Sequence, residues 1–189
     1  MADFDTLPDE ILCVRQPAGT DEVDEQGYFA ANPDVARSGQ SAMDHFVAAG
    51  QQEARLQLVN GDIVAGLRRR KLGRVAWQSG RTPIVAPRGT QNFIPREIMA
   101  SFDIPDDVPV SAHPYGPPFV ELIQNNREKL FLDVGAGLRH TYYANVVNTD
   151  IYPSVSTDVM CVGEDLPFAD DQFDFVRSEE HTSELQSPC

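Results

Sequence analysis

A short apolar segment that ends in a carboxylate and two closely spaced glycines is the part of the sequence best suited to bind a ligand. Residues 130–134 are Leu-Phe-Leu-Asp-Val, and Gly135 and Gly137 follow with one residue between them. Apolar residues around a single acid are typical of a buried parallel strand, and Gly-x-Gly after it is typical of a turn where backbone approaches a ligand. The segment therefore predicts a strand with a small-molecule site at its carboxyl end.

Three further β-rich segments follow, and the first two lead into acidic or glycine residues. Residues 142–150 end in a carboxylate, residues 157–162 precede a Gly-Glu pair, and a fourth strand is expected over 173–176. The carboxyl ends of parallel strands lie along one edge of the sheet, where ligands of open α/β proteins bind. We therefore expect an α/β fold of about four parallel strands whose carboxyl ends line a common crevice.

The order and spacing of these segments resemble the class I S-adenosylmethionine-dependent methyltransferases. The likeness covers residues 129–176 and includes Leu-Asp-Val-Gly-Ala-Gly at 132–137, Asp150, and a Glu-Asp-Leu-Pro-Phe loop at 164–168. That loop is typical of the group called methyltransferase type 11. The resemblance implies a Rossmann-like fold that binds S-adenosyl-L-methionine, here incomplete because the family's later strands are missing, and preceded by a small helical region.

The resemblance also implies cofactor-binding roles for individual residues. Gly135, Ala136 and Gly137 would let the backbone approach the methionyl part of the cofactor, and Asp133 would offer negative charge to its ammonium group. Asp150 would accept hydrogen bonds from both ribose hydroxyls. The residues that would flank the adenine are Val162, Gly163 and Glu164.

Three features depart from the family pattern. The position of a third glycine is occupied by Arg139, which could close the turn or reach an acidic substrate group, although a surface salt bridge is expected. Val162 stands where many relatives have an acid, so adenine would be held mostly by backbone. The links over 135–146 and 151–156 are shorter than the roughly dozen residues of an ordinary parallel crossover, which predicts abbreviated or missing helices.

Two other functions remain open from the residues alone. Gly-x-Gly after a strand is also half of the fingerprint of NAD-dependent oxidoreductases. Its third glycine would fall at His140, Asp150 follows Gly135 earlier than the roughly 20 residues expected, and the charged Asp133 fits that strand poorly, so methyl transfer is favoured. The second alternative is a non-enzymatic interaction module built on residues 28–55.

No catalytic base is identified. Methyl transfer would depend on holding an acceptor O, N or C atom in line with the sulfonium methyl, with a base needed only if the acceptor must lose a proton. His113, His140 and Tyr143 are near enough in sequence to be candidates, but a structural role is expected for each. The acceptor is expected to be a small molecule or a saccharide.

The segments that must position the site differ in composition. Residues 1–26 are strongly acidic and predict a mostly mobile leader, in which residues 7–14 could form one strand or a helical turn. Residues 27–76 read as a small helical module. The proline-rich segment 77–128 predicts a cover over the sheet with short helices near 95–101 and 118–126, each with proline in its first turn. His113 and Tyr115 in the loop between these helices could line a pocket, but turn residues without a chemical role are expected.

Two helices are expected in the module. One over 42–49 is capped by Ser41, and one over 63–76 is capped by Asp62. The second helix has the basic run 68–71 in its middle. We expect this run to be solvated or packed against the acidic leader, with an anion or partner patch as the alternative.

Residues 28–55 contain Tyr-x-Ala-x-Asn-Pro-Asp-Val and resemble a small helical module that occurs beside carbohydrate-active and surface-associated domains. This likeness is the reason to expect a saccharide-type acceptor, and it supplies no chemistry. His45 lies on the short apolar helix, where a packed or capping histidine is expected rather than a ligand.

Charge and cysteine content restrict the partners and the compartment. The 15 basic and 29 acidic residues give a net charge of −14, which repels phosphate backbones and disfavours nucleic-acid binding. No apolar run approaches the roughly 20 residues of a membrane span, and no secretory signal is apparent, so a cytoplasmic location is expected. Cys13, Cys161 and Cys189 lack metal-ligand spacing, so we expect free thiols and no metal.

The last residues, 177–189, resemble the translated read-through of a sequencing adapter rather than a continuation of the fourth strand. The hypothesis is that the natural sequence stops near Val176 and that the chain is a fragment of its parent methyltransferase. We then expect weak or absent methyl transfer by the chain itself and marginal stability, because the fourth strand is an unprotected edge. His181 and Cys189 receive no functional role.

Overall fold

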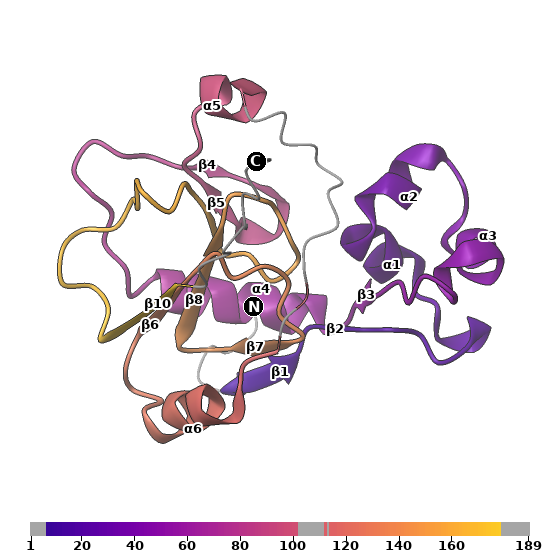
Figure 1. Ribbon diagram of the computed structural model, residues 1–189, viewed down its shortest axis with the longest axis horizontal. Coiled ribbons are helices and arrows are strands. Elements are labelled where there is room, and N and C mark those ends of the chain that lie inside the picture. The colour runs from indigo at the N-terminus through magenta and orange to yellow at the C-terminus, as the bar shows by residue number, and fades with distance from the viewer. Residues whose placement is uncertain (1–6, 102–111, 113, 179–189) are drawn as a thin grey trace, which may run out of the picture.

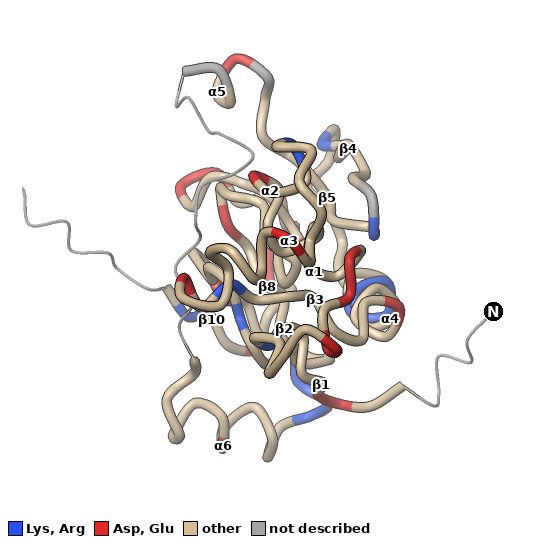
Figure 2. The backbone as a smooth tube through the Cα atoms, turned by 90° about the vertical axis from the view of Figure 1, so that its right-hand side faces the viewer, with Lys and Arg blue, Asp and Glu red and all other residues tan. Residues whose placement is uncertain are grey.

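The computed structural model describes residues 7–101, 112 and 114–178, and all structural statements refer to these ranges. The described chain is a mixed α/β protein with two parts (Figure 1). The larger part is built around a six-stranded, mostly parallel sheet. The smaller part is a group of short helices beside it, which lies in front of the sheet when the molecule is turned (Figure 2).

The central sheet contains the four predicted parallel strands in the order fourth, first, second, third. These strands are β10, β6, β8 and β9, which span Phe175–Ser178, Phe131–Val134, Val146–Asp150 and Val159–Met160. Each neighbouring pair among them is parallel. The prediction of parallel strands with a common carboxyl edge is therefore confirmed.

Two short strands that the sequence did not indicate extend this sheet. β5 (Gln91–Asn92) pairs parallel with β9, and β4 (Ile84–Val85) pairs antiparallel with β5. Both lie in the proline-rich segment, where the prolines flank the strands instead of interrupting them. The expected helices of this segment are confirmed as α5 (Arg96–Ser101) and α6 (Pro117–Asn125).

The two faces of the sheet bury different clusters, because side chains alternate along each strand. On one face, Ile123 of α6 packs against Phe131 and Val146. On the other face, Leu132 and Val147 pack with a cluster to which the end of α4 contributes. Asp133 projects on the same side as Phe131, so α6 and the loop before it cover the carboxylate.

The interpretation of residues 1–26 as a mostly mobile leader is wrong for residues 7–26, and of the two alternatives for residues 7–14 the structure contains strand rather than a helical turn. β1 (Glu10–Leu12) pairs with β7 (Thr141–Tyr143), and β2 (Val14–Arg15) pairs with β3 (Gln57–Leu58), both antiparallel. Cys13 and Val14 are completely buried between these pairs, and a 3-10 turn follows at Thr20–Glu22. Pairing with distant strands orders this acidic segment, which local composition does not reveal. Residues 1–6 lie outside the described ranges.

The expected single strand over 142–150 is divided in two. β7 belongs to the small sheet with β1, and a turn at Ala144 and Asn145 leads into β8. The links 135–145 and 151–158 contain no helix, as their shortness predicts. The first link contains β7, which pairs with β1.

The helical group consists of α1 (Glu25–Ala31), α2 (Pro33–Ser38) and α3 (Ala42–His45), and a π-helical turn at Phe46–Gly50 continues α3. Its core is formed by Tyr28, Val35, Ala42 and Phe46. The predicted cap is confirmed, since Ser41 Oγ accepts a hydrogen bond from the Asp44 N–H at 3.1 Å. His45 Nδ1 lies 3.0 Å from the Tyr28 hydroxyl, which is a packed position.

Helix α4 spans Gly61–Leu72 and packs on the sheet body, so it does not belong to the helical module in which we expected it. Its N-cap is Asn60 in a left-handed conformation, and Asp62 lies in the first turn instead of capping it. A second 3-10 turn at Pro87–Gly89 contacts α4.

The fourth strand does not stop at Val176. β10 continues to Ser178, and Arg177 and Ser178 pair in register with Asp133 and Val134 of β6. The expectation that residues 177 and 178 do not continue the strand is therefore wrong. β10 is an edge strand of the described sheet. Residues 179–189 lie outside the described ranges, and the adapter hypothesis for them stays a prediction.

Candidate functional site at the carboxyl edge of the sheet

The carboxyl ends of β6, β8 and β9 are joined by backbone hydrogen bonds at one edge of the sheet. The Ala136 N–H donates to the Thr149 carbonyl at 2.9 Å, and the Cys161 N–H donates to the Asp150 carbonyl at 3.1 Å. The Gly137 N–H donates to Asp150 Oδ2 at 2.7 Å. The glycine turn, Asp150 and the start of the loop at Val162 are thus neighbours, as the sequence predicts.

Both glycines of the turn have backbone conformations that favour glycine. Gly135 has φ 72° and Gly137 has φ 64°, and L-residues with a side chain rarely adopt these values. The Gly-x-Gly pattern therefore has a conformational cause, in addition to the close ligand approach that we expected from it. A side chain at either position would strain the turn that brings Gly137 to Asp150.

Asp150 is half-buried and already fixes two segments of backbone. Its Oδ2 accepts from the Gly137 N–H, and its Oδ1 accepts from the Tyr152 N–H at 2.9 Å. A carboxylate has about four acceptor positions, so two bonds leave capacity for hydroxyl donors. Asp150 is held in one orientation and remains able to bind a diol.

The loop after β9 reaches back toward the first strand. A Cβ atom added at Gly163 would lie 3.4 Å from Val134 Cγ1, which is ordinary contact distance. Val162 is half-buried, whereas Gly163 and Glu164 are exposed. The three residues expected at the adenine therefore lie at the same edge as the glycine turn, with Glu164 on the solvent side.

Asp133 lies beneath this edge and is completely buried. Its Oδ2 accepts from the Tyr115 hydroxyl at 2.6 Å and from Arg139 Nε and Nη2 at 3.0 and 2.8 Å. Its Oδ1 is buried and has no hydrogen-bond partner. The carboxylate is therefore satisfied on one oxygen only, two residues before the glycine turn.

The surface salt bridge expected for Arg139 is wrong, because the side chain is 1% exposed. Its guanidinium lies 4.3 Å from the centre of the Tyr115 ring while it pairs with Asp133. A buried carboxylate needs a buried counter-charge, and Arg139 supplies it. The arginine at the third glycine position thus stabilises the strand instead of facing solvent.

Tyr115 belongs to the site, so of the two alternatives for this residue, a pocket position and a turn residue without a chemical role, the favoured turn residue is wrong. Its hydroxyl also lies 3.2 Å from Asn148 Oδ1. Burial and the neighbouring Asp133 charge raise the pKa of Tyr115 well above its usual value, so the phenol stays protonated and donates. Burial likewise raises the pKa of Asp133, although Arg139 and Tyr115 oppose the shift.

Two of the candidate bases, His140 and Tyr143, line a small cavity of about 80 Å³ together with Tyr115 and Arg139. His140 is exposed, and Tyr143 is buried in the cluster under α6. His113 lies outside the described residues. The described part of the chain therefore assigns no general base to the site.

A second buried carboxylate, Asp158, lies between α4 and the sheet. Its Oδ1 accepts from Arg68 Nε at 3.1 Å and from the Tyr142 hydroxyl. Its Oδ2 accepts from Lys71 Nζ at 2.6 Å and from the Asn148 N–H at 2.8 Å. Both oxygens of Asp158 are therefore fully engaged.

We expected the basic run 68–71 to be solvated or packed against the acidic leader. The solvated alternative is wrong for two of its residues, whereas packing against the leader is confirmed for Arg70, which donates to the carbonyls of Leu7 and Pro8. Arg68 and Lys71 are buried, and Lys71 Nζ also donates to the carbonyls of Val146 and Tyr143. Burial lowers the pKa of Lys71 to about 8, although Asp158 opposes the shift. The sequence suggests a surface patch because the counter-charge, Asp158, lies far from the run along the chain.

Both cysteines in the described ranges, Cys13 and Cys161, are free and buried. Burial raises the pKa of each thiol from 9.0 to about 12. They are protonated at neutral pH and are therefore poor nucleophiles. The prediction of free thiols is confirmed for these two, and Cys189 lies outside the described residues.

Comparisons of the chain with protein-family models, with curated proteins and with solved structures gave no match. Within the described ranges, every helix is too short or too polar to cross a membrane. The support for a function therefore comes from the fold and from the geometry of the carboxyl edge.

Proposed function

We propose that the carboxyl edge of β6, β8 and β9 binds S-adenosyl-L-methionine in a Rossmann-like fold and that the chain carries the cofactor-binding half of a methyltransferase. The observation that carries the proposal is the bond between the Gly137 N–H and Asp150 at the ends of the first two parallel strands. In doubly wound sheets, ligands bind where the strand order reverses. That point is β6 here, since β8 lies on one side and β10 on the other.

The donor set at this edge fits the parts of such a cofactor. Asp133 has one buried oxygen without a partner, which suits an ammonium group because a buried acceptor gains most from a charged donor. Asp150 keeps acceptor capacity for two ribose hydroxyls. Val162 and Gly163 offer backbone for the adenine, with Glu164 beside them.

When bound, the cofactor supplies an electrophilic methyl group on a sulfonium. The residues of the chain bind it, fix its orientation and hold the glycine turn open to it, so that an acceptor can approach in line. The proposed acceptor is a small molecule or a saccharide. A cytoplasmic location is supported by the two free buried thiols, which are typical of a reducing compartment.

The test is a calorimetric titration of the full chain with S-adenosylhomocysteine. Asp150→Ala is expected to weaken binding about tenfold or more, because hydrogen bonds to a charged group are lost. Asp44→Ala is the matched control: it removes the same charge from an exposed position on α3 and should leave the affinity unchanged. Circular dichroism verifies that each variant is folded.

Each outcome of these titrations tests one part of the proposal. Unchanged affinity in Asp150→Ala would remove the ribose assignment. Binding of NADH in place of S-adenosylhomocysteine would favour a nicotinamide-dependent oxidoreductase. If neither ligand binds, the carboxyl edge is not a nucleotide site, and a non-enzymatic role of the helical module becomes the better hypothesis.

A further inference from the structure

A cavity larger than the one beside Tyr115 lies between the helical group and the start of α4. It has a volume of about 470 Å³, and its walls come from the turn before α1, from β3, from the first turn of α4 and from the 3-10 turn at Pro87–Gly89. Pockets of roughly 300–1,000 Å³ enclose small ligands and often lie between two parts of a fold. The residues that line this cavity do not belong to the carboxyl edge, so it is separate from the proposed cofactor site.

A buried glutamine holds the wall on the side of the helical group. Gln57 is 2% exposed, its Nε2 donates to the Glu22 carbonyl at 2.7 Å, and its Oε1 accepts from the Asp24 N–H at 2.9 Å. An ion pair between Arg15 and Glu22 at 3.3 Å joins two further residues of the same wall. These bonds fix Asp24 relative to β3, so this wall is formed before any ligand binds.

Three charged side chains that line the cavity have capacity for a ligand. Asp24 Oδ1 accepts from the Gly27 N–H at 2.6 Å, and its Oδ2 has no hydrogen-bond partner among the described residues. The side chains of Asp62 and Arg88 also line the cavity and form no ion pair or hydrogen bond within the described part of the chain. The cavity therefore offers two carboxylates and one guanidinium, which come from three separate segments.

A purely structural explanation accounts for the two carboxylates but not for the guanidinium. Asp24 caps α1, and an acid in the first turn of α4, such as Asp62, interacts favourably with the helix dipole. Arg88 has φ 66°, a left-handed conformation that is unfavourable for a residue with a side chain. Its carbonyl accepts from Arg68 Nη1 at 2.9 Å, a bond that glycine would supply without this strain. A ligand for its side chain would account for an arginine at this position.

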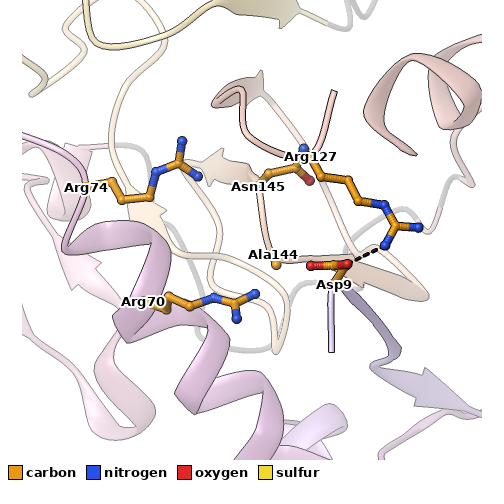
Figure 3. A pocket seen from close by; sticks show the side chains of 6 residues that line it. All are labelled: Asp9, Arg70, Arg74, Arg127, Ala144 and Asn145. Carbon is orange, nitrogen blue, oxygen red and sulfur yellow. Dashed lines mark hydrogen bonds and ion pairs between the residues drawn. The ribbon is translucent and has the colours of Figure 1, made fainter. Parts of the chain in front are cut away.

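Another cavity, of about 230 Å³, shows how charges that are already engaged differ from these three (Figure 3). It lies at the opposite edge of the sheet from the carboxyl ends, because Asn145 in its lining directly precedes β8. There, Arg127 is paired with Asp9, and Arg74 interacts with Asp174. These charges are balanced within the fold, whereas the three charges of the larger cavity remain available to a ligand.

We propose that the cavity between the helical group and α4 binds a free basic amino acid, independently of the proposed cofactor site. Such a ligand has two positive groups and one carboxylate, which is the complement of two acids and one arginine. Its carboxylate pairs with Arg88, since a guanidinium presents parallel N–H donors that match a carboxylate. Its two cationic groups donate hydrogen bonds to Asp24 and Asp62.

The test is a calorimetric titration of the full chain with L-lysine, for which saturable binding is expected. Norleucine lacks the side-chain ammonium group and cadaverine lacks the carboxylate, so each should bind about tenfold more weakly because charge-assisted hydrogen bonds are lost. Arg88→Gln should weaken lysine binding about tenfold without weakening cadaverine binding, whereas Asp62→Asn should weaken both. The matched controls are Arg37→Gln and Asp44→Asn, at exposed positions that do not line the cavity.

Absence of saturable lysine binding by the unmodified chain would overturn the proposal. So would equal weakening of lysine and cadaverine binding in Arg88→Gln, or equal weakening in the control variants, which would indicate a general charge effect. If circular dichroism shows that Arg88→Gln is unfolded, Arg88→Lys is used in its place, because it keeps the charge but loses the parallel donors and should weaken lysine binding selectively. Affinity for S-adenosylhomocysteine should not change in these variants, so failure of one site is distinguishable from failure of the other.

Discussion

Asp133 and Asp158 are both completely buried carboxylates beside the parallel strands, but their surroundings differ in one respect. Asp158 accepts hydrogen bonds on both oxygens, from two cations, a phenol and a backbone N–H. Asp133 accepts bonds on Oδ2 only, from Arg139 and Tyr115, and its Oδ1 has no partner. A fully satisfied carboxylate is a structural group, whereas a half-satisfied one next to a glycine turn has capacity for a ligand.

The partners of the two carboxylates also come from different distances along the chain. Asp158 binds Arg68, 90 residues away, and so ties α4 to the sheet. Asp133 binds Arg139, six residues away, across its own glycine turn. The first cluster holds the fold together, and the second shapes the edge of one strand. The same substitution at the two positions should therefore have different consequences.

Asp158→Asn is expected to have the largest effect on stability. It leaves Arg68 and Lys71 buried without their counter-charge, so the free energy of unfolding should fall by about 3–5 kcal/mol. Urea unfolding followed by circular dichroism measures the change. Asp165→Asn is the control, because Asp165 is exposed and its pair with Arg81 should contribute about 0–1 kcal/mol. Equal losses in the two variants would contradict the structural role of Asp158.

Asp133→Asn is expected to cost less stability and to affect binding instead. It leaves one buried cation, Arg139, without its counter-charge, whereas Asp158→Asn leaves two, so the free energy of unfolding should fall by about 3 kcal/mol, at the lower end of the range for a broken buried pair. The affinity for S-adenosylhomocysteine should fall about tenfold, since the negative charge beside the turn is lost. Asp133→Asn and Asp158→Asn are compared by calorimetry under conditions where both are folded. A loss of affinity only in Asp158→Asn would show that Asp158, and not Asp133, is the carboxylate that supports ligand binding.

Deprotonation of the buried thiol of Cys13 has a smaller effect on stability, and this effect depends on pH. The pKa of Cys13, which packs beside the Asp158 cluster, is raised by burial from 9.0 to about 12. The unfolded chain loses this proton first, so the stability contributed by the protonated thiol is complete below about pH 9 and is lost as pH rises toward 12.

Comparison of Cys13→Ala with the unmodified chain isolates this contribution. Between about pH 9 and pH 12, the free energy of unfolding should fall less steeply with pH in the variant. The two slopes should differ by about 1.4 kcal/mol per pH unit. The lowered pKa of Lys71, about 8, has the opposite effect on the pH dependence of stability. Because Lys71 is present in both proteins, its effect cancels in the comparison. Identical slopes in urea unfolding between pH 9 and 12 would show that Cys13 is not buried as described.

The parts of the fold that the sequence predicts are those with local signals. The parallel strands follow from apolar runs that end in Asp or Gly, and the short helices follow from prolines in their first turns. The roles of β1, β2, β4 and β5 depend on pairing with strands elsewhere in the chain, which local composition does not encode. For the same reason, residues 7–26 read as a loose acidic leader.

In the candidate site, too, some residues have a local sequence signal and others depend on contacts between distant segments. Gly135, Gly137 and Asp150 form a local motif and are found together at the edge, as predicted. The burial of Arg139 and the contact of Tyr115 with Asp133 depend on how α6 and its preceding loop cover the strand. No spacing in the sequence relates residue 115 to residue 133, so this part of the site required the structure.

Amide chemical shifts, recorded while S-adenosylhomocysteine is added to the full chain, locate the bound ligand on the sheet. A cofactor site at the carboxyl edge predicts saturable shifts at Gly135, Gly137 and Gly163, with Ala144 and Asn145 at the opposite edge unaffected. Shifts that are absent from the glycine turn, or that are centred at Ala144 and Asn145, would contradict a cofactor site at the carboxyl edge of β6, β8 and β9.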